Sequence, residues 1–144
     1  MIYLDNAATT KTAPEVVEAM LPYFSEYYGN PSSIYAIAGK SKEAITKGRE
    51  QIANVLGAKP EEIYFTSGGT ESDNWAVFGT AAGYSRSGKH MITTSIEHPA
   101  MLMPMRRMEE LGWDITVLDV DEKGYIDMEQ LKSYVRKDTV LVST

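Results

Sequence analysis

The sequence has 144 residues, 43% hydrophobic and 24% charged, proportions typical of a soluble globular protein. Its formal net charge is −6 and its 14 basic residues are scattered, which argues against nucleic acid as a partner. It contains no cysteine and two histidines, so we expect neither disulfides nor a metal site. Because it shows no signal-like segment and no long apolar run, we also expect no membrane association and a cytoplasmic location.

The first part of the sequence predicts a short strand and two helices. Residues 2–4 form a strand-like apolar run. Residues 12–15 have the Ser/Thr-x-x-Glu form of a capping box with a proline in the first turn, so a helix is expected over residues 14–27. A second helix is expected over residues 39–56, with Gly57 just past its end.

From residue 63 onward the pattern alternates between strand and helix. Strands are expected over residues 63–66, 90–94, 114–118 and 139–143. Helices are expected over residues 71–84 and 100–111 and after a second capping-box form at 127–130. This alternation predicts an α/β fold with a mainly parallel sheet flanked by helices. Since the sequence stops within an apolar strand, we interpret it as part of a longer protein.

The turn Ser67-Gly68-Gly69-Thr70 is a candidate anion site. It follows an expected strand, and ligands of parallel α/β sheets bind where strands end and helices begin. Glycines permit positive φ and leave backbone N–H groups open to an anion, while Thr70 adds a hydroxyl donor. The turn matches neither the P-loop nor the dinucleotide motif, which disfavours a nucleotide. The competing interpretation is an ordinary capped helix, with Thr70 as N-cap and Asp73 completing a capping box.

His98 is expected in a second loop at the same edge of the sheet. Pro99 restrains its backbone to extended geometry just before a helix, so the ring is placed to face a ligand. A single loop histidine is more often simply exposed, and this alternative stays open. His90 opens a strand and is interpreted as structural.

Four motifs occur along the chain in one order: YLDNAATT, GNPSS, FTSGGTESDN, and EH before an apolar helix. Together they resemble the N-terminal part of a cysteine desulfurase, a NifS-like member of the class V aminotransferases, which have fold type I and use pyridoxal 5'-phosphate. The resemblance runs from Tyr3 to Ser143. It implies that residues 15–144 are an incomplete N-terminal part of the large, cofactor-binding domain, and that residues 1–14 contribute to the small domain or an active-site loop.

The resemblance also implies roles for individual residues. Gly69 and Thr70 would hold the cofactor phosphate through backbone N–H groups and the threonine hydroxyl. His98 would stack on the pyridine ring and act as a catalytic residue in proton transfer. The loop expected near the substrate side consists of Asn6, Ala7, Ala8 and Thr9. The family often has a histidine shortly after GNPSS, but residues 34–37 contain none, so its role is not transferred.

In the resembled family, L-cysteine becomes alanine and its sulfur is left as a persulfide on an enzyme cysteine. The sulfur then passes to an acceptor or scaffold protein for iron–sulfur cluster assembly or thiolation, and the enzymes are homodimers. The family's Schiff-base lysine region and catalytic cysteine have no match in this sequence, so the isolated chain is expected to be inactive. Two alternatives stay open. One is a non-catalytic module that binds phosphate or dimerises, and the other is a related class V enzyme for another amino acid.

Overall fold

The computed structural model describes residues 2–144, which divide into two compact units. The first unit ends at Tyr64, and the second unit spans Phe65–Thr144. The division separates a helical part from an α/β part. The domain boundary between residues 14 and 15 stays a prediction. None of the described helices is long and apolar enough to cross a bilayer.

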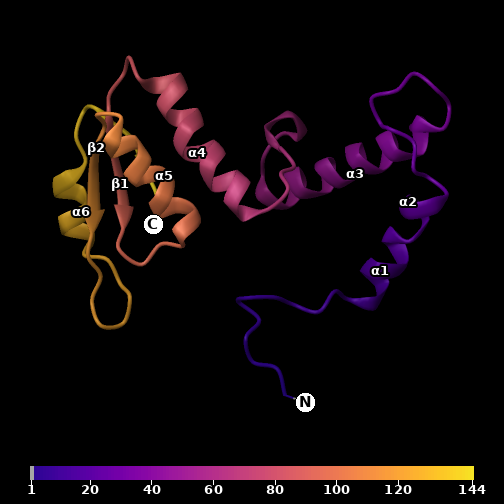
Figure 1. Ribbon diagram of the computed structural model, residues 1–144, viewed down its shortest axis with the longest axis horizontal. Helices are drawn as coiled ribbons and strands as arrows, with labels where there is room; N and C mark the ends of the chain where they lie inside the picture. The colour runs from indigo at the N-terminus through magenta and orange to yellow at the C-terminus, as the bar shows by residue number, and fades with distance from the viewer. Residues whose placement is uncertain (1) are drawn as a thin grey trace. The chain divides into compact units, whose positions relative to one another are not determined.

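The first unit is built from helices (Figure 1). Its elements are α1 (Pro14–Met20), α2 (Pro22–Ser25), α3 (Ala38–Leu56) and the short 3-10 helix η1 (Pro60–Glu62). The single helix predicted over residues 14–27 is therefore interrupted, because Pro22 has no N–H to continue the α1 ladder. The expected capping box is also wrong, since Ala13 is the N-cap of α1 and no side chain caps it.

The long helix α3 follows its prediction closely. It ends at Gly57, whose φ of 66° lies in the left-handed region that glycine adopts at low cost. Two strand predictions in this part of the chain are wrong. Residues 2–4 and 63–66 form no strand, because no neighbouring strand in the described chain pairs with them.

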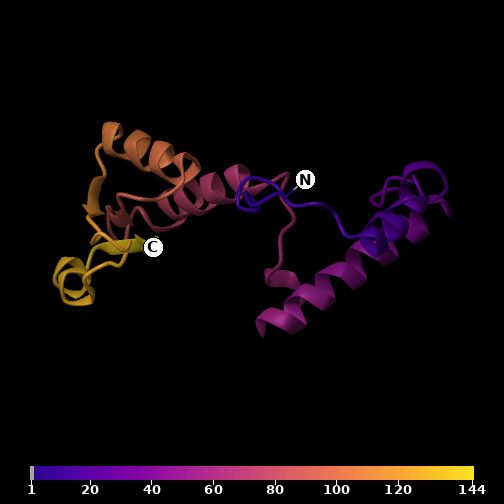
Figure 2. The same cartoon turned by 90° about the horizontal axis from the view of Figure 1, so that it is seen from below.

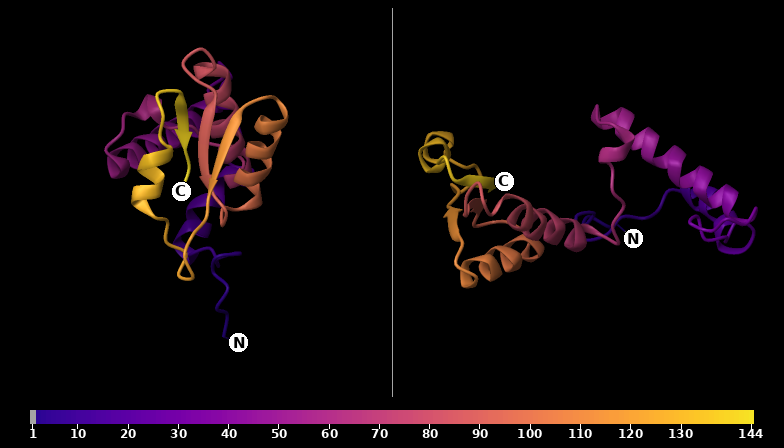
Figure 3. Two further views of the ribbon diagram at one scale, coloured as in Figure 1. Left: turned by 90° about the vertical axis from the view of Figure 1, so that its left-hand side faces the viewer. Right: turned by 90° about the horizontal axis from the view of Figure 1, so that it is seen from above.

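The second unit is a parallel α/β layer structure. Its elements are α4 (Gly69–Tyr84), β1 (His90–Thr94), α5 (Pro99–Glu110), β2 (Asp114–Leu118), α6 (Met128–Tyr134) and β3 (Thr139–Val142). The sheet has the order β2-β1-β3, with β1 parallel to both neighbours (Figure 3). These elements confirm the predicted strand and helix alternation from residue 71 onward.

The core of this unit lies between the sheet and the pair α4 and α5. Figure 2 shows α5 and α6 on opposite sides of the sheet. The buried cluster contains Val77, Ala81, Met91, Met101, Met105, Met108 and Trp113. The three buried methionines of α5 fall at helical spacing, so that one face of the helix is buried. This packing holds α4 and α5 side by side on the sheet.

His90 joins all three strands at the amino edge of the sheet. Its side chain is fully buried. Nδ1 lies 2.7 Å from the Thr139 hydroxyl of β3, and Nε2 lies 2.8 Å from the Thr116 hydroxyl of β2. A neutral imidazole has one donor and one acceptor nitrogen, and each can pair with a hydroxyl group. His90 is therefore structural, and its side chain links the two outer strands to β1 by hydrogen bonds.

An ionic cluster lies at the same edge. The Arg136 guanidinium donates to Asp114 at 2.6 Å and to both carboxylate oxygens of Asp138 at 3.0 and 3.1 Å. Burial and then the positive charge of Arg136 lower the pKa of His90 below its ordinary 6.5, while the charges of Asp114 and Asp138 oppose that shift. The folded chain thus favours a neutral His90.

This pKa shift predicts acid-sensitive stability. Since the unfolded chain binds a proton at His90 more readily, the stabilisation is complete above about pH 6.5 and falls as the pH decreases below that value. Urea unfolding between pH 5 and 7.5, about the range where histidine titrates, should show this slope. His90→Gln should be less stable at neutral pH and should lose the His90 part of the slope. Equal slopes in both proteins would contradict the prediction.

Candidate functional site

The topology of the second unit brings two helix N-termini to the carboxyl edge of the sheet. α4 precedes β1 and must end near the amino edge, where β1 starts. α5 follows β1 and must begin near the carboxyl edge, where β1 ends. Both helices therefore begin at the edge where parallel α/β sheets bind ligands.

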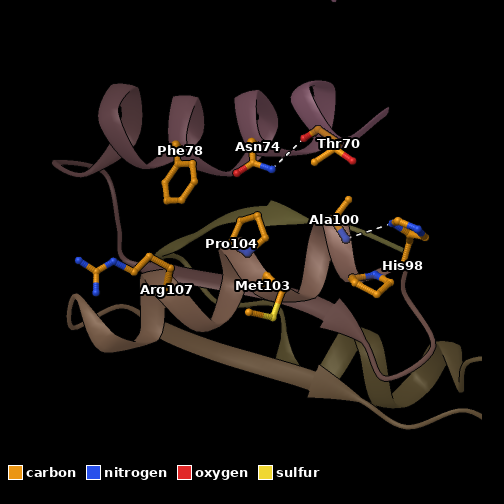
Figure 4. Close-up of a pocket in the computed structure, with 9 residues that line it drawn as sticks. Thr70, Asn74, Phe78, His98, Ala100, Met103, Pro104 and Arg107 are labelled. Carbon is orange, nitrogen blue, oxygen red and sulfur yellow. Dashed lines mark hydrogen bonds between the residues drawn. The ribbon is translucent and has the colours of Figure 1, made fainter. Parts of the chain in front are cut away.

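A pocket of about 470 Å³ lies between these helices (Figure 4). From α4 it is lined by Thr70, Asn74 and Phe78. From α5 and its cap it is lined by His98, Pro99, Ala100, Met103, Pro104 and Arg107. Two of the predicted site residues, Thr70 and His98, thus line one pocket although they are far apart in sequence. Within residues 2–144, no group of three or more His, Asp or Glu side chains is arranged to hold a metal ion.

The turn before α4 differs from the expected capping box. The N-cap is Gly68, not Thr70, and no side chain caps the helix from that position. Gly68 has a φ of 165°, which is extended backbone, and neither Gly68 nor Gly69 has a left-handed conformation. A Cβ added at either glycine would meet no atom within 4 Å. The two glycines thus leave the backbone of the turn uncovered by side chains. They are not needed for a left-handed backbone conformation.

The donors at the start of α4 are open. The N–H groups of Gly69 and Thr70 donate to no acceptor in the described chain, as is usual for the first turn of a helix. Within the same part of the chain, the Thr70 hydroxyl has no hydrogen-bond partner either. Three neutral donors at the positive end of a helix suit a phosphate group. Gly69 and Thr70 therefore fit the group that the sequence implies.

His98 is the N-cap of α5. Its backbone is extended, with φ −60° and ψ 147°, as Pro99 predicts. Its Nδ1 accepts a hydrogen bond from the Ala100 N–H at 3.0 Å. With Nδ1 as an acceptor, a neutral ring carries its hydrogen on Nε2. The ring lies on the pocket wall, so His98 both caps a helix and borders the candidate site (Figure 4).

The predicted substrate-side loop lies in the first unit. Asn6, Ala7 and Ala8 form a turn in which the Asp5 carbonyl accepts from the Ala8 N–H at 3.1 Å, and Thr9 follows that turn. They are exposed, and every residue that lines the pocket belongs to the second unit. Their role near the substrate stays a prediction.

The sequence reasoning missed several residues of the pocket. Asn74 and Phe78 follow Thr70 at intervals of four, so all three share one face of α4. The Asn74 side-chain amide donates to the Thr70 carbonyl at 2.8 Å. The same spacing places Arg107 one turn beyond Met103 on α5. Applying helical spacing from Thr70 would have identified this face.

Comparison with known proteins identifies the family of this chain. The model of the class V aminotransferases matches residues 2–144. The chain belongs to this family. It is 52% identical over 142 residues to a cysteine desulfurase IscS of Methanosarcina thermophila and 51% identical over 142 residues to that of Dictyoglomus turgidum, covering 99% of this chain in both cases. It spans 35% and 36% of the length of these two class V relatives.

Solved structures give the same fold for this class V chain. A NifS-like protein aligns with a TM-score of 0.93 at 38% identity, covering 98% of this chain and 39% of the other. A structure titled SspA in complex with cysteine aligns with a TM-score of 0.91 at 40% identity, covering 97% of this chain and 40% of the other. The fold is therefore that of the NifS-like cysteine desulfurases, as the motifs predicted.

The cap formed by His98 can be separated from any role of its ring. His98→Ala removes the acceptor for the Ala100 N–H and should lower the free energy of unfolding by about 1 kcal/mol. His98→Asn keeps a capping acceptor and should stay close to the unmodified chain. Urea unfolding at neutral pH checks both variants. Equal losses for alanine and asparagine would show that the cap does not stabilise α5.

Proposed function

We propose that this chain holds the phosphate end of the cofactor in a pyridoxal-phosphate-dependent cysteine desulfurase. The observation that carries the proposal is the meeting of Thr70 and His98 in one pocket, beside open N–H groups. The family supports the identity of the cofactor. Gly69 and Thr70 would bind its phosphate, and His98 would contact its ring.

The residues of the pocket have separate tasks in this proposal. Gly69 and Thr70 bind and orient the phosphate through neutral donors. Bound pyridoxal phosphate supplies an electron-withdrawing ring. His98 would stack beside that ring, and its Nε2–H would donate a hydrogen bond to a group there when the imidazole is neutral. A role of His98 in proton transfer stays part of the proposal. Phe78 and Met103 supply apolar surface along the pocket wall.

The proposed substrate is L-cysteine, because the relatives are named cysteine desulfurases and one aligned structure was solved in complex with cysteine. Its sulfur would pass to a cysteine thiolate as a persulfide, leaving alanine, and then to an acceptor or scaffold protein for iron–sulfur cluster assembly. The 144 residues include no cysteine, so the thiolate is not on this chain. We further propose a homodimer and a cytoplasmic location for the whole enzyme.

The missing thiol favours a second candidate. By itself, the chain would act as a non-catalytic module that binds phosphate weakly or pairs with another chain. A related class V enzyme with a different amino-acid substrate is compatible with the same pocket, because the phosphate site does not select the substrate.

Binding of pyridoxal phosphate tests the phosphate site. Titration followed by absorbance should show weak binding to the unmodified chain. Thr70→Ala should weaken it at least about 10-fold, since a hydrogen bond to a charged group contributes about 1.5–3 kcal/mol. Thr70→Ser keeps the hydroxyl and should bind like the unmodified chain.

Two outcomes would contradict the proposal. Unchanged affinity in Thr70→Ala would remove Thr70 from the site. A stoichiometric lysine adduct after borohydride reduction, together with sulfide release from L-cysteine, would show that the 144-residue chain is active by itself. Neither adduct nor sulfide is expected.

A further inference from the structure

The carboxylate of Glu71 reaches back over the turn before α4. One oxygen, Oε2, accepts from the Ser67 N–H at 2.6 Å and from the Ser67 hydroxyl at 2.7 Å. These two bonds lower the pKa of Glu71 below its ordinary 4.5, so the carboxylate is ionised at neutral pH. Glu71, in the first turn of α4, thus holds Ser67 in the loop that precedes the helix.

The rest of the turn is fixed from the other side. The Thr66 hydroxyl lies 2.7 Å from the Ser72 hydroxyl and donates to the Gly68 carbonyl at 3.2 Å. The Ser72 N–H also donates to that carbonyl, at 3.2 Å. Residues 66–68 are therefore held by side chains of the turn and of α4, and none of these bonds uses the N–H groups of Gly69 and Thr70.

Helix α6, in the same unit, has the usual arrangement, in which a side chain caps the first turn. There the Asp127 carboxylate accepts from the N–H groups of Glu129 and Gln130, at 2.8 and 3.2 Å. Such a cap occupies the donors of the first turn. At α4 the N-cap is Gly68, which has no side chain, and the acidic group bonds upstream of the first turn. The turn is ordered while its donors stay open.

We propose that Glu71 is a positioning residue for the phosphate site: it holds Ser67 so that the Gly69 and Thr70 N–H groups stay in place at the start of α4 without an internal acceptor. This inference rests on the proposed phosphate site. Glu71 does not touch the phosphate, and its negative charge, close to that site, opposes a phosphate dianion. Its contribution is therefore the acceptor that it provides to Ser67.

Two variants isolate the acceptor from the charge. Glu71→Gln and Glu71→Ala both remove the charge, but only glutamine retains an oxygen that can accept from Ser67. Hydrogen exchange of the Ser67 amide, read by NMR without any ligand, should be about 10-fold faster in the alanine variant than in the glutamine variant, as expected for one lost hydrogen bond. Exchange in the middle of α4 shows whether the helix stays folded.

Binding gives the second measurement, with inorganic phosphate and pyridoxal phosphate as probes. Glu71→Ala should bind both about 5- to 10-fold more weakly than Glu71→Gln, because the turn loses its fixed conformation. Glu129→Ala is the matched control, since Glu129 is also a first-turn glutamate, with a side chain that is 83% exposed, on α6. It should bind like the unmodified chain.

The outcomes separate this inference from the proposed function. Equal Ser67 exchange, or equal phosphate binding, in the two Glu71 variants would overturn the positioning role alone, provided that the unmodified chain binds phosphate. Failure of the unmodified chain to bind either probe would overturn the proposed phosphate site and the positioning role with it. Faster exchange and weaker binding in Glu71→Ala alone would support both.

Discussion

The packing of α4 and α5 on one face of the sheet is the constraint on which the candidate site depends. Val77 and Ala81 of α4 share a buried cluster with Met101, Met105 and Met108 of α5. Both helices run from the carboxyl edge of the sheet toward its amino edge, so this cluster sets the separation of their N-termini. A pocket with a phosphate-type donor set on one wall and an imidazole on the other follows from that arrangement.

The two edges of the sheet differ in whether their polar groups are paired within the chain. At the amino edge, His90 bonds to hydroxyl groups on both neighbouring strands, and Arg136 pairs with two carboxylates. At the carboxyl edge, the first N–H groups of α4 have no acceptor in the described chain. Exposed N–H groups at the start of a helix can bind an anion, so the carboxyl edge is the one suited to a ligand.

The elements predicted from the sequence are right where the local pattern and the topology agree. They are wrong where the structure depends on a partner segment that the local sequence does not reveal. The strands and helices of the second unit alternate strongly, and Gly57 ends α3 as expected. Residues 63–66 have strand composition but no partner strand in the described chain, and composition cannot supply one. The approach of Thr70 and His98 followed from the rule for parallel sheets. The hydrogen bond from the Ser67 N–H to Glu71 did not follow from the sequence, because the glutamate bonds to a residue before the helix and the N-cap is a glycine.

The proposed phosphate site would rely on uncharged donors in an acidic chain. The only cation that lines the described pocket is Arg107, and it pairs with Glu110 at 2.7 Å. Phosphate binding at the proposed site would therefore depend on neutral N–H and hydroxyl donors and on the α4 dipole, which act only at short range. Such donors need a fixed backbone, whereas a flexible lysine can follow its ligand. The proposed site would therefore depend on the order of its turn, which is the reason for the proposed positioning role of Glu71.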